Sequence, residues 1–358
     1  MKKRFNEYFS KLNRTRVSLN RDLNSGLRLD RNERVDDYAP EVIKGILDSF
    51  TAYDFSAYPE IDSLYKKLAK WMGIDEECIL LTSGSDAGIK QIIEMLSNEG
   101  DKIFVPSPTF AMYEVYCHMY HRNFVEISYS LDSFLIDLES IYTQIDENTA
   151  LVFLPNPNQP IDTLNSIETL EKLIQHCSKY NTFLVVDEAY YLFSDITAIE
   201  LTQKYDNVLV LRTFSKAFGL AGVRLGYIVG NQENINYLGK TRHMIEANTL
   251  SVKSAEYLLD NIQFVHDYVA TVKLSQEYLK QELLDIGIKC TGTNANFIFI
   301  NLETQDKRDD AIQYLKSKSI YVRGGFKKPW DSFIRVSVGT KEKMKIFLKE
   351  FKQWNEKR

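Results

Sequence analysis

The amino-acid sequence predicts an α/β protein with a mostly parallel central sheet in a large domain and a smaller α+β domain. Two features carry this prediction. Over the first two thirds of the chain, short apolar segments alternate with amphipathic helical segments, which is typical of a parallel sheet covered by helices on both faces. From about residue 251 the pattern changes to long amphipathic helices followed by a few strands, which indicates a second, smaller unit.

In the first part of the chain, helical periodicity predicts helices at residues 41–50 and 64–71. The apolar segments predicted to be strands follow at 78–82, 102–106, 124–128, 150–154, 183–186 and 208–211. A helix at 167–180 connects two of them. The small-residue turn 83–88 separates the first strand from a helix at 89–96. Because the N-terminus of a helix presents free backbone amides, this turn is a candidate phosphate site.

In the last third, the pattern predicts a long helix at 254–282 and strands at 296–301, 320–323 and 333–338. Residues 1–27 are polar and rich in Lys, Arg and Asn, and we expect them to form an N-terminal arm. We assign residues 51–250 to the large domain. Residues 28–50 and 251–358 are assigned to the small domain.

Composition excludes several classes of protein. The 358 residues are 44% hydrophobic and 26% charged, as in ordinary soluble proteins, and a net charge of −5 argues against binding nucleic acid. No stretch approaches the about 18 apolar residues of a membrane-spanning helix, and no apolar segment follows the basic start as in a signal peptide. The four cysteines and five histidines show no metal-ligand spacing. We therefore expect free thiols, no metal, no membrane partner and a cytoplasmic location.

The most informative segment for chemistry is 212–224. Lys216 follows the apolar residues 208–211 and can therefore lie at the end of a buried strand. Thr213, Ser215 and Arg224 would then converge as donors to one phosphate. A phosphate site beside a potentially nucleophilic amine is what pyridoxal 5'-phosphate bound as a Schiff base requires. A surface lysine in a turn is the alternative, and the surrounding pattern disfavours it.

Upstream residues test this interpretation independently. Asp187 ends the apolar segment 183–186, and open α/β sheets bind ligands at the carboxyl ends of their strands. Its carboxylate could pair with a protonated pyridine nitrogen. Asn158, which follows the strand at 150–154, and Tyr190 could donate to the phenolic oxygen of the ring. Each residue alone could be a helix cap or a turn, but their joint order is far more specific.

Together these motifs resemble the class I and II aminotransferases of fold type I, and most resemble the histidinol-phosphate aminotransferases. The resemblance spans about residues 28–345. It rests on Tyr58-Pro-Glu60, Thr82-Ser-Gly-Ser-Asp86, Pro106-Ser-Pro-Thr-Phe110, Asn158, Asp187-Glu-Ala-Tyr190, Thr213-Phe-Ser-Lys216, Arg224-Leu-Gly226 and Ile334-Arg-Val-Ser-Val-Gly-Thr340. It implies the aspartate aminotransferase-like fold and an enzyme that uses pyridoxal 5'-phosphate.

The resemblance also implies roles for individual residues. Lys216 would hold the cofactor covalently, and Phe110 would stack on its ring, where the family usually has a tyrosine. Tyr58 would reach into the site of a neighbouring subunit, so the resemblance implies a homodimer. The remaining cofactor contacts would be Asp187 at the pyridine nitrogen, Asn158 and Tyr190 at the phenolic oxygen, and Thr213, Ser215, Arg224 and the amides around Ser85 and Asp86 at the phosphate.

Three residues are candidates for binding the substrate. Arg335, on the strand at 333–338, would bind an anionic group of the substrate, although an exposed charge on an edge strand is the alternative. Arg323 could bind a substrate phosphate or form a structural salt bridge. Asn32, in the segment 29–33, resembles the entry motif of the family.

The expected function is an aminotransferase that acts on a small phosphorylated amino or keto substrate, with glutamate as the amino donor. The substrate would be histidinol phosphate or a shorter 2-amino or 2-keto alkyl phosphate, such as serinol phosphate or dihydroxyacetone phosphate. The shorter substrate is considered because the chain departs from the family at Phe110 and after Pro160, where the usual small-residue turn is replaced by Ile161-Asp162. The alternatives are an O-phospho-amino acid decarboxylase and, more remotely, a non-catalytic effector-binding protein.

Overall fold

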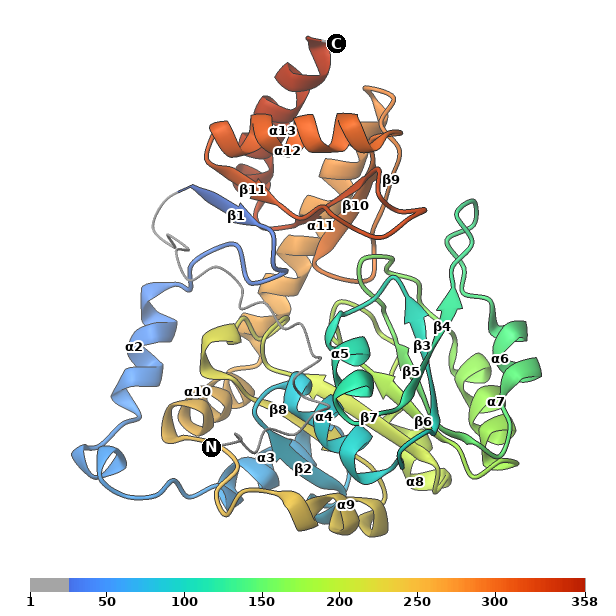
Figure 1. Ribbon diagram of the computed structural model, residues 1–358. Coiled ribbons are helices and arrows are strands. Elements are labelled where there is room, and N and C mark those ends of the chain that lie inside the picture. The colour runs from blue at the N-terminus through green and yellow to red at the C-terminus, as the bar shows by residue number, and fades with distance from the viewer. Residues whose placement is uncertain (1–25, 358) are drawn as a thin grey trace, which may run out of the picture.

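The computed structural model describes residues 26–357 and is built around a seven-stranded sheet (Figure 1). Its strands are parallel except for β8, which is antiparallel to both of its neighbours. This confirms the predicted mostly parallel central sheet. In spatial order the strands are β2 (Ile79–Thr82), β8 (Gly226–Val229), β7 (Val208–Thr213), β6 (Phe183–Asp187), β5 (Thr149–Pro155), β3 (Lys102–Ser107) and β4 (Asn123–Ser128).

Strand β8 was not predicted from the sequence, because it directly follows the loop that carries Lys216. It begins at Gly226, which lies opposite Thr82 of β2 and Thr213 of β7. A Cβ atom at Gly226 would lie 2.7 Å from the backbone of both Gly84 and Ser85. A glycine is therefore needed for β8 to pass this close to the turn at the end of β2.

Helices cover both faces of the sheet. Along β5, Leu151 and Phe153 pack on one face, whereas Val152 and Leu154 pack on the other. The first face is covered by α4 (Ser85–Met95), α5 (Met112–Met119) and α9 (Gln232–Leu238). The second face is covered by α3 (Asp62–Met72), α7 (Ile167–Ser178), α8 (Ile199–Lys204) and α10 (Thr249–Asp260). Burial on both faces explains why these strands are continuous apolar runs in the sequence.

A smaller α+β unit contains most of the last third of the chain (Figure 1). Its antiparallel sheet has the order β12 (Phe333–Ser337), β10 (Phe297–Asn301), β9 (Cys290–Thr291). Its helices are α11 (Gln263–Leu284), α12 (Gln305–Ser317) and α13 (Lys341–Glu356). Strand β1 (Leu27–Leu29) pairs in parallel with β11 (Ile320–Val322) in this unit. That pairing supports our proposal that the chain from residue 28 belongs with 251–358, although α10, at the start of that range, packs on the large sheet.

Two further expectations concern the N-terminal arm and the long helix of the small domain. The predicted arm at 1–27 lies outside the described residues, except for Gly26 and Leu27. The single helix expected at 254–282 is wrong, because α10 ends at Asp260 and α11 begins at Gln263. Asn261 causes the break: its backbone N–H and its side-chain amide both donate to the carbonyl of Tyr257, which closes the last turn of α10.

Candidate active site

Lys216 lies just beyond the carboxyl end of β7, as the sequence predicted. Its amine donates to the carbonyl oxygens of Asn32, at 3.1 Å, and Arg31, at 3.3 Å. Burial, and next the positive charge of Arg335, lower the pKa of Lys216 to about 8. Because a neutral amine is the nucleophilic form, roughly a tenth of Lys216 is in the reactive form at pH 7, far more than for a lysine of ordinary pKa.

Asp187, at the carboxyl end of β6, is a buried carboxylate that is only 5% exposed. It accepts hydrogen bonds from the hydroxyl of Tyr113, at 2.5 Å, and from the backbone N–H of Ala189, at 3.0 Å. Burial raises the pKa of Asp187 to about 6, although the hydrogen bond from Tyr113 opposes the shift. A cation brought next to Asp187 would therefore stabilise its charged form.

A group of donors surrounds the N-terminus of α4. Gly84 is its N-cap, with a φ of 81° and no capping side chain. A Cβ atom there would lie 2.6 Å from Nη2 of Arg224, so the guanidinium lies directly against this turn. Nη1 of Arg224 donates to Oγ of Ser215 at 3.4 Å, and the hydroxyl of Thr213 donates to the same oxygen at 3.0 Å. Within residues 26–357, Arg224 forms no ion pair. Its guanidinium and the positive N-terminal end of α4 therefore suit an added anion.

Asp86 and Phe110 lie near these groups. The carboxylate of Asp86 accepts from the hydroxyl of Tyr116 at 2.9 Å, so only its backbone amide is available to the anion site at the start of α4. The side chain of Phe110 is 39% exposed, and its ring meets that of Tyr113 edge-on at 6.3 Å. Phe110 is thus linked through Tyr113 to Asp187, and part of its side chain stays exposed to solvent.

Asn32 is buried at the point where the two units meet. Its side-chain amide donates to the hydroxyl of Tyr190 at 2.8 Å, and its side-chain oxygen accepts from Ser337 at 3.2 Å. Asn296 donates to its carbonyl at 3.0 Å, next to the amine of Lys216 on the same oxygen. Since these contacts occupy the side chain of Asn32, we propose that it positions Tyr190 instead of binding the substrate.

Asn158 and Gln159 follow β5 but make different contacts. The amide of Asn158 is fully buried, donating to the carbonyl of Pro108 at 2.9 Å and accepting from the hydroxyl of Thr109 at 2.6 Å. The side-chain oxygen of Gln159 accepts from the guanidinium of Arg335. The structure therefore brings Gln159, and not Asn158, into contact with the predicted substrate arginine.

Arg335 is a buried cation on β12, 8% exposed. Besides Gln159, it donates to the carbonyl of Asp30 at 2.9 Å, and its Nε has no partner in the described chain. Burial lowers the pKa of Arg335 to about 10. The exposed Arg323 is its cross-strand neighbour, with backbone hydrogen bonds of 2.7 and 3.0 Å between them. No carboxylate among residues 26–357 pairs with Arg335, so an external anion would supply the missing charge.

The sequence profile of the family "Aminotransferase class I and II" matches residues 23–351. The chain belongs to the class I and II aminotransferases. It is 34% identical to histidinol-phosphate aminotransferase 1 of Carboxydothermus hydrogenoformans, over 90% of this chain and 91% of that protein. The resemblance on which the predicted family and enzyme class rest is thereby confirmed.

Solved structures confirm the aspartate aminotransferase-like fold of this aminotransferase. The histidinol-phosphate aminotransferase of Sinorhizobium meliloti, solved with pyridoxal 5'-phosphate, has a TM-score of 0.88 at 22% identity and covers 100% of this chain and 99% of its own. The L-threonine-O-3-phosphate decarboxylase of Porphyromonas gingivalis has a TM-score of 0.76 at 20% identity, covering 92% and 99%. Aminotransferases and a decarboxylase thus share the fold, so the fold alone does not determine the reaction.

The site of this aminotransferase fits the predicted cofactor, pyridoxal 5'-phosphate, which the family and the structural comparison support. The donors around Arg224 and the start of α4 suit its phosphate, and the buried carboxylate of Asp187 suits its protonated ring nitrogen. The partly neutral amine of Lys216 suits its aldehyde. These three groups match the three chemical parts of the cofactor.

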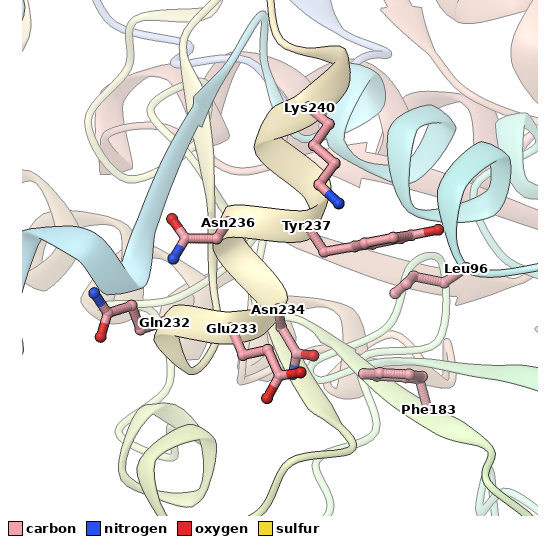
Figure 2. A pocket seen from close by; sticks show the side chains of 8 residues that line it. All are labelled: Leu96, Phe183, Gln232, Glu233, Asn234, Asn236, Tyr237 and Lys240. Atoms are coloured by element: carbon pink, nitrogen blue, oxygen red, sulfur yellow. The ribbon is translucent and has the colours of Figure 1, made fainter.

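A surface depression of about 600 Å³ lies elsewhere on the aminotransferase (Figure 2). Most of its lining comes from α9, together with Phe183 and Leu96. Phe183 is the first residue of β6, whereas Asp187 is the last, so the depression lies at the other end of the strand from the active site. None of the predicted site residues lines it.

Sequence reasoning missed four residues of the site: Tyr113, Gln159, Asn296 and Ser337. Tyr113 lies nearly one helical turn after Phe110, a spacing that could have indicated a shared face. Ser337 lies two residues after Arg335 on the same strand, and residues at that spacing point to the same face of a sheet. Gln159 and Asn296 gave no comparable signal, because loop conformation decides where their side chains point.

Proposed function

We propose that this aminotransferase transfers an amino group between glutamate and a small phosphorylated substrate, with histidinol phosphate as the first candidate. The observation that carries the proposal is the buried Arg335, which has no anionic partner in the described chain and lies beside the exposed Arg323. A pair of arginines without carboxylates suits a substrate that carries a carboxylate or a phosphate. The 34% identical relative named above favours histidinol phosphate over a shorter alkyl phosphate.

The chain's own residues divide the work of the reaction. Pyridoxal phosphate, when bound, supplies an electron-withdrawing ring that stabilises negative charge on the carbon next to the amino group. Asp187 would keep the ring nitrogen protonated, and Tyr113 would orient Asp187 through the 2.5 Å hydrogen bond. Arg224, Ser215 and the amides at the start of α4 would hold the phosphate end in place.

Lys216 would have two functions. Its neutral amine would hold the cofactor, and the same amine, when free, would accept the proton from the carbon next to the substrate amino group. The carbonyl oxygens of Arg31 and Asn32 lie within hydrogen-bond distance and would steady the amine while it carries that proton. Positioned proton transfer of this kind contributes about 10²–10⁴-fold to rate.

The proposal is tested by absorption spectroscopy of the protein loaded with pyridoxal phosphate. We expect a visible band that glutamate bleaches and that the keto form of histidinol phosphate restores, with histidinol phosphate as the product. A band that no amino donor bleaches would contradict the aminotransferase reaction on these substrates. Release of carbon dioxide from an O-phospho-amino acid without formation of a keto acid would instead establish the decarboxylase alternative, which the 34% identical relative does not favour.

We also propose that the protein is a homodimer in which Tyr58 reaches the active site of the partner subunit. The supporting observation is a set of uncovered aromatic side chains at Tyr53, Phe55 and Tyr58, which are 76%, 83% and 76% exposed. They lie between α2 (Pro40–Asp48) and α3, on a segment at the edge of the molecule (Figure 1). Large exposed aromatic groups of this kind are typical of protein interfaces.

Replacing Phe55 by glutamate should weaken this dimer. The charge would have to be buried against the partner, so we expect the dissociation constant to rise at least about tenfold. Sedimentation equilibrium measures the change, starting from a wild-type mass of twice 41.6 kDa. Leu274→Glu is the control, because Leu274 is also exposed, at 68%, but lies on α11. A monomeric wild-type protein would contradict the proposal.

We propose a cytoplasmic location. All four cysteines are free thiols, and three of them are buried, which is typical of proteins in a reducing compartment. Across residues 26–357, no helix combines the length and the apolar character required to cross a bilayer.

A further inference from the structure

We propose that Asp162 is a positioning residue that holds the small domain over the active site through the turn Thr293–Asn294. This inference rests on the proposed function. It concerns the loop 159–162, which follows β5 in the large domain. We call these residues the bridging loop.

The bridging loop is anchored firmly to the large domain. At its start, Asn158 is fixed to the backbone of Pro108 and to Thr109. Around it, the side chain of Asn156 donates to the carbonyl of Asn165 at 3.1 Å and accepts from its backbone N–H at 2.7 Å. The loop therefore offers fixed groups against which a second unit can dock.

Asp162 is the contact from this loop to the small domain. Its carboxylate is 6% exposed and accepts hydrogen bonds from the backbone N–H groups of Thr293 and of Asn294, the latter at 2.7 Å. The side chain of Asn294 donates back to the carbonyl of Asp162 at 3.1 Å. No cation among the described residues pairs with Asp162, so its charge is directed entirely at this turn. Hydrogen bonds to an ionised group are stronger than neutral ones.

Packing alone does not hold the turn. A cavity of about 330 Å³ lies against it, lined by Thr293 and Asn294 on one side and by Leu164 and Phe193 on the other. Among the described residues, the hydrogen bonds that join this turn to the large domain are those with Asp162.

The turn leads directly to the active site. Asn296, two residues after Asn294, donates to the carbonyl of Asn32, and that oxygen also accepts from the amine of Lys216. Val338 donates to the carbonyl of Asn296 at 2.8 Å, which joins the turn to the end of β12, the strand of Arg335. Movement of the turn would therefore displace the substrate arginine relative to the lysine.

Other contacts between the two units are separate from this one. Lys327 pairs with Glu114 at 3.1 Å, and the ring of Phe134 packs against Trp330 at 5.6 Å. These contacts would keep the small domain in place without Asp162. Loss of Asp162 should therefore loosen the turn and its connected residues without detaching the domain.

The test replaces Asp162 by alanine in the full-length protein loaded with pyridoxal phosphate. We expect the KM for glutamate to rise about tenfold while kcat stays within about threefold, because the turn leads to the strand of Arg335, whereas Lys216 follows β7 in the large domain and also donates to the carbonyl of Arg31. The visible band without glutamate should be unchanged, since Lys216, Asp187 and Arg224 all lie in the large domain. Amide exchange of the peptide 292–297, followed by mass spectrometry, should become faster.

Two variants serve as controls. Asp162→Asn keeps an oxygen that can accept from the turn, so we expect it to restore most of the wild-type KM. Asp137→Ala removes a similar hydrogen bond, from a carboxylate to the backbone N–H of Ser140 at 3.1 Å, but at the N-terminus of α6 (Leu138–Gln144) in the large domain. It should leave the KM unchanged.

The possible failures are distinguishable. A wild-type protein whose band does not respond to glutamate would overturn the proposed function, and the inference with it. A wild-type response that Asp162→Ala retains with an unchanged KM would overturn the positioning role alone. So would a fall in kcat at unchanged KM, because that would place Asp162 in the chemistry and not in the docking of the turn.

Discussion

Replacing Lys216 by alanine lowers kcat/KM for amino transfer by at least about four orders of magnitude, because the substitution removes both the covalent attachment and the proton acceptor. Steady-state kinetics with glutamate measures the loss, and the visible band of the loaded protein should disappear with it. Lys216→Arg should be equally inactive, since a guanidinium stays protonated at the pH of the assay.

The matched control is Lys240→Ala. Lys240 lines the depression at the opposite end of the sheet and should be replaceable without loss of activity. Retention of more than a few per cent of activity in Lys216→Ala would contradict the assignment of the site.

The pKa of Lys216 gives a second way to check the same residue. Only the neutral amine attaches to the cofactor, so the attachment rate should rise with pH and reach half its maximum near the pKa of about 8 in the cofactor-free protein. A lysine at the ordinary value of 10.5 would place this midpoint more than two pH units higher. Stopped-flow absorbance across pH 6–10 locates it, and a midpoint above pH 10 would show that the amine is not buried beside Arg335.

Replacing Arg335 by alanine should have the second largest effect, a loss of about 10³-fold in kcat/KM, expressed mainly in KM for the substrate anion that it binds. The reason is that Arg335 is buried and forms no ion pair within residues 26–357, so its charge is available to the substrate. Arg335→Lys keeps the charge but loses the forked geometry, and should recover only part of the activity.

Arg323→Ala is the informative comparison, because Arg323 is the cross-strand neighbour of Arg335 but is exposed. Screening by water should limit its contribution to about tenfold. Measuring KM separately for glutamate and for the phosphorylated substrate shows which anion each arginine binds. Wild-type KM values for both substrates in Arg335→Ala would contradict its role.

The sequence was sufficient for the parts of the site that lie on regular elements. Asp187 and Lys216 follow apolar strands, and the rule that ligands bind at the carboxyl ends of parallel strands predicts that both residues lie at the same edge of the sheet. Gly84 and Ser85 were found in the same way, as a turn between a strand and a helix.

Other parts of the site depend on geometry that no sequence pattern encodes. Asn158 and Gln159 differ by one position in an irregular loop, and that difference decides which side chain meets Arg335. The hydrogen bond from Tyr113 to Asp187 depends on how α5 packs on the sheet. Strand β8 directly follows the loop of Lys216, so its apolar residues were not recognised as a separate strand.

The antiparallel strand β8 also has a consequence for the order in which the protein matures. It lies between β2 and β7, so Gly226 joins two neighbours that the ribosome has made earlier, and it brings Arg224 to the Ser85 turn. A nascent chain that ends before this strand has the turn, but it has no β8 paired with β2 to place Arg224 beside it. Pyridoxal phosphate can therefore bind here only after translation has passed the middle of the polypeptide. Its binding cannot assist the folding of the earlier half.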